Sequence, residues 1–146
     1  GWSGMTVRRS EIRVATRYAE LERLCAFVAE GADAAGLSAQ ARDHVQLAVD
    51  EAATNVIQHG YGGEGDESFT VAWTAEPGRL TIVVTDQAPP FDPASIPDLP
   101  TPESVDDLSV GGYGLRFIRQ VMDEVDYVRR DGVNRLTLVK KTKDEG

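Results

Sequence analysis

Residues 50–61 read Asp-Glu-Ala-Ala-Thr-Asn-Val-Ile-Gln-His-Gly-Tyr and are the most informative stretch of this 146-residue chain. Apolar residues three and four positions apart lead into it, which predicts a helix that begins with an N-cap at Ser38 and runs through the stretch. The apolar stripe consists of Val45, Ala48, Val49, Ala52 and Val56. Glu51, Asn55 and His59 stand at positions i, i+4 and i+8, so we expect them on roughly one face.

These three polar residues suggest a chemistry. The amide oxygen of Asn55 is of the kind that ligates Mg²⁺, a hard cation. The carboxylate of Glu51, one turn earlier, could accept a proton from an attacking hydroxyl or water. On spacing alone a solvated helix face is the more frequent explanation, and His59 is more typical of a capping or packed histidine than of a ligand.

The remaining pattern predicts an α+β fold. Strands are expected at residues 10–15, 68–75, 79–85, 125–130 and 134–141, and further helices at 17–36 and after Gly114. Pro77-Gly78 and Asp131-Gly132 are turn signals between neighbouring strands. This order predicts a two-layer α/β sandwich, with a mixed, mostly antiparallel sheet and the helices on one face.

Two further motifs flank a long loop. Asp86 follows the most apolar strand, where its carboxylate could accept hydrogen bonds from an amine such as that of adenine, although an Asp that starts a turn is at least as frequent. Gly111-Gly112-Tyr113-Gly114 precedes a helix, and glycines with free N–H groups at a helix start favour phosphate. Residues 87–110 hold most of the prolines, and so long a loop is usually functional or disordered.

Composition excludes several classes of protein. With 15 basic and 24 acidic residues the chain has a net charge of −9, which argues against non-specific binding to nucleic acid. Its single cysteine, Cys25, cannot form an internal disulfide and lacks the spaced partners of a zinc site. The chain has no apolar run of membrane-spanning length. We therefore expect a cytoplasmic protein, with residues 1–4 as a cloning remnant and one domain over 5–146.

Taken in order, these motifs resemble those of the GHKL ATPase superfamily, which has the Bergerat nucleotide-binding fold. More narrowly, the chain is similar to the bacterial anti-sigma-factor serine kinases. Residues 50–61 resemble the N-box of that family, residues 84–93 its adenine-binding G1 box and residues 111–115 its G2 box. The resemblance covers roughly residues 10–141, so a single histidine-kinase-like ATPase domain is expected.

The resemblance implies roles for individual residues. Glu51 would be the catalytic base, Asn55 the Mg²⁺ ligand, and Asp86 the residue that binds the adenine amino group. Further contacts to ATP would come from Ala88, Gly112, Gly114, Leu115 and Thr137. The segment 87–110 would be the lid that closes over the nucleotide.

The resemblance also implies a function. The protein would be an ATP-dependent serine kinase and anti-sigma factor that binds a sigma factor and phosphorylates a serine of a small antagonist protein, commonly as a homodimer. One departure is Ala88, where the family usually has glycine, and alanine restricts positive φ, so we expect an altered turn and weaker nucleotide binding. The alternative is a non-catalytic regulator that holds ATP or no nucleotide and acts by sequestering its partner.

Overall fold

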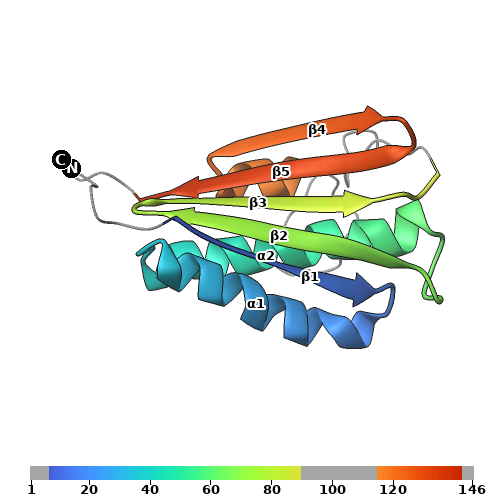
Figure 1. The fold of residues 1–146 in the computed structure, drawn as a ribbon, viewed down its shortest axis with the longest axis horizontal. Helices are drawn as coiled ribbons and strands as arrows, with labels where there is room; N and C mark the ends of the chain where they lie inside the picture. The colour runs from blue at the N-terminus through green and yellow to red at the C-terminus, as the bar shows by residue number, and fades with distance from the viewer. Residues whose placement is uncertain (1–6, 90–114, 143–146) are drawn as a thin grey trace, which may run out of the picture.

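The computed structural model describes residues 7–89 and 115–142, which form an α+β sandwich of two layers (Figure 1). In chain order the elements are β1 (Arg8–Ala15), the 3₁₀ turn η1 (Tyr18–Glu20), α1 (Leu21–Ala34), α2 (Ala39–Asn55), the π-helical turn η2 (Val56–Gly60), β2 (Ser68–Glu76), β3 (Arg79–Asp86), α4 (Leu115–Val121), β4 (Glu124–Arg130) and β5 (Val133–Lys141). The five strands lie in the order β1-β2-β3-β5-β4. The predicted class is confirmed, with one correction: every strand pairing described is antiparallel, so the sheet is not mixed.

Two tight turns fix the register of the sheet. Gly78, with φ of +81°, closes the β2–β3 hairpin after Pro77. Asp131 and Gly132 both have positive φ, 54° and 79°, as the two central residues of a type I′ hairpin turn require. Because side chains alternate between the two faces, this register decides which residues of β3 and β5 face the helices.

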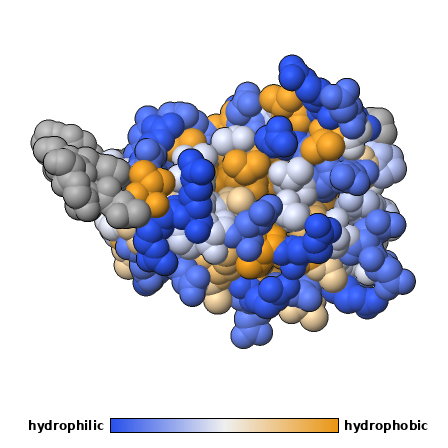
Figure 2. Space-filling model, in the orientation of Figure 1, coloured by the Kyte–Doolittle hydropathy of each residue, from blue (hydrophilic) through white to orange (hydrophobic). Residues whose placement is uncertain are grey.

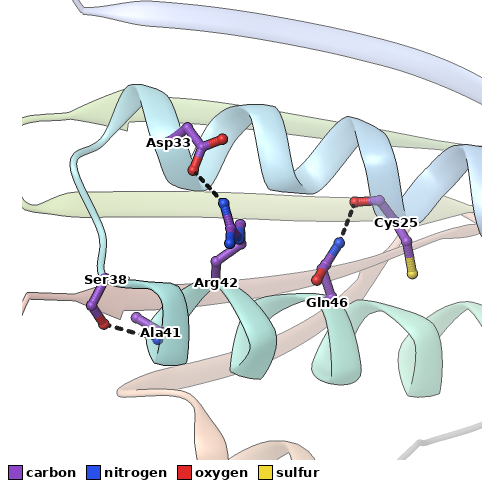
Figure 3. Close-up of polar contacts among 6 residues, drawn as sticks. All are labelled: Cys25, Asp33, Ser38, Ala41, Arg42 and Gln46. Atoms are coloured by element: carbon purple, nitrogen blue, oxygen red, sulfur yellow. Dashed lines mark hydrogen bonds and ion pairs between the residues drawn. The ribbon is translucent and has the colours of Figure 1, made fainter.

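The junction between α1 and α2 follows its predicted caps. Gly36 has φ of +76°, and the amide of Leu37 donates to the carbonyl of Ala32 at 3.0 Å, as in a Schellman motif. The hydroxyl of Ser38 then accepts a hydrogen bond from the amide of Ala41 at 3.0 Å and caps α2 (Figure 3). The two helices therefore reverse direction within a few residues.

Two polar contacts cross between these helices (Figure 3). Arg42 of α2 pairs with Asp33 of α1, with 3.1 Å between Nη1 and Oδ1, and Gln46 Nε2 donates to the backbone carbonyl of Cys25 at 3.0 Å. The first pair is exposed, so it adds little stability. Together the Arg42–Asp33 and Gln46–Cys25 contacts nevertheless join α2 directly to α1.

Trp73 of β2 forms the centre of the interface between α1 and the sheet. Its ring is 1% exposed, lies 5.8 Å from the ring centroid of Phe27, and donates from Nε1 to the Phe27 carbonyl at 2.9 Å. Gly31 of α1 passes directly over the ring, where an added Cβ would lie 2.7 Å from Cδ2 of Trp73. A glycine inside this helix is thus explained by close packing on the tryptophan.

The molecular surface is mixed in character. On the face that Figure 2 shows, small hydrophobic patches are separated by hydrophilic side chains. Large apolar side chains that are exposed include Val7, Tyr18, Leu47 and Val128. None of the described helices has the length and apolar composition that crossing a bilayer requires.

Candidate functional site

The end of α2 carries the first two candidate residues. Glu51 is 6% exposed and Asn55 only 2%, so a solvated helix face is the wrong explanation for both. The helix then widens into η2, where the amide of Tyr61 donates to the carbonyl of Val56 at 2.9 Å, five residues earlier. His59 lies in this turn and is exposed. The regular 3.6-residue period on which the predicted shared face rests ends at Asn55, and His59, unlike Glu51 and Asn55, is not buried.

Asn55 presents an unsatisfied amide. Within the described part of the chain, its buried Oδ1 and Nδ2 atoms have no hydrogen-bond partner. Leaving a buried polar group unpaired costs about 1–3 kcal/mol, so such groups generally bind a ligand, an ion or water. The Asn55 side chain is thus available for a group that the described residues do not supply.

Asn55 faces a cavity between α2, the sheet and α4. The cavity is lined by Ala52, Asn55, Val56, Val84, Asp86, Leu115, Ile118, Tyr127 and Leu136. Its volume is about 10 Å³, which accommodates one water molecule. Asp86 and Leu115 are also predicted site residues, and they line the same cavity as Asn55.

Asp86 ends β3 and is 5% exposed. Its Oδ1 accepts hydrogen bonds from Asn134 Nδ2 at 2.7 Å and from the amide of Ala88 at 2.9 Å. The bond from the Ala88 amide is the one that an Asp at the start of a turn accepts, so the alternative explanation of Asp86 as a turn residue is also correct. Within the described residues Oδ2 accepts no hydrogen bond, so one oxygen remains for a donor on a ligand.

Asn134, which our sequence reasoning missed, orients this carboxylate. It is 1% exposed and stands opposite Asp86 in the β3–β5 pairing. Its Oδ1 accepts from Arg129 Nη1 at 2.7 Å and from the Tyr127 hydroxyl at 2.9 Å, which turns Nδ2 towards Asp86. The signal in the sequence was an asparagine two residues before Leu136, at a position of β5 that faces the core.

Ala88 is buried in the loop after β3 and adopts an ordinary backbone conformation. Among the described non-glycine residues only Asp131 has a positive φ, so the backbone at Ala88 is one that alanine adopts without strain. Its side chain is 1% exposed, and its carbonyl accepts hydrogen bonds from Arg129 Nη1 and Asn134 Nδ2, each at 3.2 Å. Ala88 is therefore accommodated without backbone strain, and its effect on nucleotide binding stays a prediction.

The other predicted nucleotide contacts divide into two groups. Thr137 pairs with Val83 on β5, on the opposite face from Asn134 and Leu136, so the structure does not bring it to the cavity. This placement corrects the sequence-based assignment of Thr137. Gly112, Gly114 and residues 90–110 of the expected lid lie outside the described residues.

Tyr61 connects the end of η2 to the loop after β3. Its hydroxyl accepts a hydrogen bond from the amide of Gln87 at 3.0 Å. Burial raises the pKa of the Tyr61 hydroxyl, the hydrogen bond from Gln87 opposes that rise, and the charges of Asp86 and Glu67 add to it. The phenol thus stays protonated at neutral pH and joins the segment that carries Asn55 to the loop that begins at Asp86.

Comparisons with known proteins agree with this geometry. Residues 14–140 match the family model of the histidine kinase-like ATPase domain. The serine/threonine-protein kinase BtrW of Bordetella bronchiseptica is 31% identical over 108 residues, 74% of this chain and 76% of that protein. The serine-protein kinase RsbW of Listeria monocytogenes is 32% identical over 107 residues, 70% of this chain and 68% of that protein.

A solved structure shows the same fold. The crystal structure of the RsbU and RsbW domains of a Mycobacterium tuberculosis protein matches with a TM-score of 0.64 at 17% identity. The match covers 92% of this chain and 32% of that longer chain. At this identity the similarity concerns the fold alone.

Proposed function

Because the chain belongs to the histidine kinase-like ATPase domain family, together with the serine-protein kinases BtrW and RsbW, we propose that it is an ATP-dependent protein serine kinase. The observation that carries the proposal is the buried amide of Asn55, which has no hydrogen-bond partner in the described residues and lines the same cavity as the carboxylate of Asp86. Asn55 offers an amide oxygen that could bind a cation, and Asp86 offers a carboxylate oxygen that could accept a hydrogen bond from an amine.

Asp86 would recognise the adenine base. Its Oδ2 would accept a hydrogen bond from the exocyclic amine, while Asn134 holds Oδ1 from the other side. Apolar side chains that line the cavity, among them Val84, Ile118 and Leu136, would contact the ring. A buried carboxylate aimed at a donor gives specificity, because a base without that amine leaves the acceptor unpaired.

Asn55 fits a magnesium ion. Its Oδ1 is a hard oxygen donor of the kind Mg²⁺ takes, and in the described residues no group of three or more His, Cys, Asp or Glu residues could hold a metal. The ion would therefore depend on phosphate oxygens and water for its other ligands, as magnesium in kinases commonly does. When bound, Mg²⁺ would offset the negative charge of the triphosphate.

Glu51 would act as the general base. It lies one helical turn before Asn55 and is 6% exposed. The serine hydroxyl of a partner protein would lose its proton to this carboxylate as the oxygen bonds to the γ-phosphorus and the bond to ADP breaks. Positioning and charge stabilisation, rather than a covalent enzyme intermediate, would supply the rate enhancement.

The partners we propose are a sigma factor and a small antagonist protein that carries the phosphorylated serine. A net charge of −9 suits a basic partner, because charge complementarity raises association rates. We also propose a homodimer that works in the cytoplasm.

A second function is favoured by the small size of the cavity. About 10 Å³ cannot hold a nucleoside, so ATP binding requires movement of the wall formed by Leu115 and Ile118. If that wall stays in place, the chain would regulate its partner by sequestration, without turnover of nucleotide.

A phosphotransfer assay separates these functions. The protein would be incubated with labelled ATP, Mg²⁺ and a candidate antagonist, with calorimetry of ATP binding in parallel. Labelled serine supports the kinase, and Glu51→Gln should reduce the label at least a hundredfold while the affinity for ATP changes little. Heat of binding without label supports an ATP-holding regulator. A stable complex with neither heat nor label supports sequestration without nucleotide and contradicts the kinase.

A further inference from the structure

A groove that is open to solvent lies between α1 and α2. Its volume is about 470 Å³, and it is lined by Cys25 of α1 and by Asp43, Gln46, Leu47 and Asp50 of α2. Figure 3 shows the Cys25 thiol on the side of α1 that faces α2. None of these five residues takes part in the proposed phosphotransfer.

Three of the lining side chains form a stripe along α2. Asp43, Leu47 and Asp50 lie four and three positions apart, so they follow one face of the helix. The two aspartates are two helical turns apart, which corresponds to about 10 Å along the axis. Leu47 stands between them and is 51% exposed, more than any other large apolar side chain in the described residues. The groove therefore offers an apolar contact between two negative charges.

The carboxylates of this stripe are not neutralised by the protein that surrounds them. Within the described part of the chain, neither the Asp43 nor the Asp50 carboxylate forms an ion pair or a hydrogen bond. The arginines of the two helices, Arg23 and Arg42, are already paired with other carboxylates at 2.8 and 3.1 Å. Burial raises the pKa of Asp50, so its charged form would gain from a cation supplied by another molecule.

We propose that this groove binds a cationic amphipathic helix of a partner protein. The helix that fits carries two lysines or arginines seven positions apart, opposite Asp43 and Asp50, with a large apolar residue between them that packs on Leu47. Helices commonly bind in grooves through anchors at positions i, i+3 or i+4, and i+7. The charges would speed association and fix the register of the helix, because charge complementarity acts mainly on these properties.

A second copy of this chain does not supply such a helix. α1 and α2 carry one arginine each and no lysine, and the arginines of α4, Arg116 and Arg119, lie three positions apart. None of the described helices therefore has the basic pair that the groove fits. The basic partner that we propose above would supply the helix, and in that respect the inference rests on the proposed function.

A designed peptide tests the groove in the absence of nucleotide. The probe is a synthetic alanine-based helical peptide with two arginines seven positions apart and a leucine between them. Its binding to the full chain is measured by calorimetry at low salt. A peptide of the same composition, with its arginines on opposite faces of the helix, is the control probe and should bind about tenfold more weakly.

Cys25 reports where the peptide binds, because it is the only cysteine of the chain and lines the groove. At a peptide concentration of about ten times the dissociation constant, roughly a tenth of the protein remains free. Modification of Cys25 by a disulfide reagent should therefore slow about tenfold. Salt at about 1 M should weaken both the binding and the protection, because it screens exposed charges.

Variants of exposed residues identify the contacts without a risk to folding. Leu47→Ala should weaken peptide binding about tenfold, because the central apolar contact is lost. Asp43→Asn should weaken it about threefold at low salt. Glu30→Gln is the matched control, because it also removes one exposed carboxylate but at a position of α1 that does not line the groove, and it should bind as the wild type.

Three results would overturn the proposal. Equal weakening by Glu30→Gln and Asp43→Asn would mean that net charge alone attracts the peptide. Unchanged reactivity of Cys25 in the saturated complex would place the peptide elsewhere. Reactivity of Cys25 that falls with protein concentration, without peptide, would mean that a second copy covers the groove. Because no nucleotide is present, these results are independent of the phosphotransfer assay, and failure of the proposed kinase activity would leave them unchanged.

Discussion

Asn134 Nδ2 lies 2.7 Å from Asp86 Oδ1, and the two residues stand opposite each other where β3 and β5 pair. The contact places an amide donor against Oδ1 of a carboxylate whose Oδ2 accepts no hydrogen bond from the described part of the chain. The proposed recognition of the base would therefore depend on two residues that lie 48 positions apart in the sequence.

Replacing Asn134 should damage both stability and binding. Asn134→Ala removes partners from Asp86, Tyr127 and Arg129, and we expect a loss of about 2 kcal/mol in the free energy of unfolding, measured with urea. ATP affinity should fall as well. Thr137→Ala is the control, since Thr137 lies on the opposite face, and an equal loss of ATP affinity there would contradict the site as described.

Replacing Asn55 should separate stability from binding. Asn55→Leu removes a buried amide that has no hydrogen-bond partner among the described residues, so the free energy of unfolding should rise by about 1 kcal/mol or stay unchanged. The same variant should lose magnesium-dependent ATP binding, measured by calorimetry with and without the ion. A clear drop in stability would show that the amide has a structural partner and would remove the main argument for a ligand.

Replacing Gly31 tests the packing of α1. In Gly31→Ala the new Cβ would lie 2.7 Å from the Trp73 ring, so helix and sheet must separate, and we expect a loss of about 2 kcal/mol. Gly65→Ala, where a Cβ meets nothing within 4 Å, should change the unfolding free energy by less than about 0.5 kcal/mol. Equal effects of the two substitutions in urea unfolding would mean that backbone entropy, not packing, matters at Gly31.

Cys25 should react slowly with thiol reagents. Burial raises the pKa of its thiol, and the nearby charge of Asp50 raises it further, so less of the reactive thiolate is present at a given pH. Asp50→Asn should therefore increase the rate of modification by a disulfide reagent near pH 8 severalfold. Asp43→Asn, on the same groove, is the control, and identical rates for the two variants would rule out the effect of Asp50.

Local signals in the sequence predicted most of the fold. Gly36 and Ser38 marked the end of one helix and the start of the next, and Asp131-Gly132 marked the last hairpin, because each of these depends on the backbone preferences of only a few residues. Alternation and helical periodicity located the elements between them. These features need no knowledge of which segments meet.

The errors arose where a residue's role depends on distant structure. The helix after Asn55 widens by about one residue per turn, which nothing in the local pattern indicates, and His59 in that turn is exposed rather than buried like Glu51 and Asn55. Thr137 was assigned from the family resemblance, whereas the register between β3 and β5 places Asn134 beside Asp86. The roles of Gly112 and Gly114 stay predictions.

The order of the strands leaves β1 and β4 as the edges of the sheet. Both edges are rich in charge, with Arg8, Arg9, Glu11 and Arg13 on β1 and Glu124, Asp126, Arg129 and Arg130 on β4. Charged side chains on an edge discourage another chain from adding a strand through its main chain, which protects against aggregation. A protein built this way is suited to select its partners by side chains on its faces and loops rather than by continuation of its sheet.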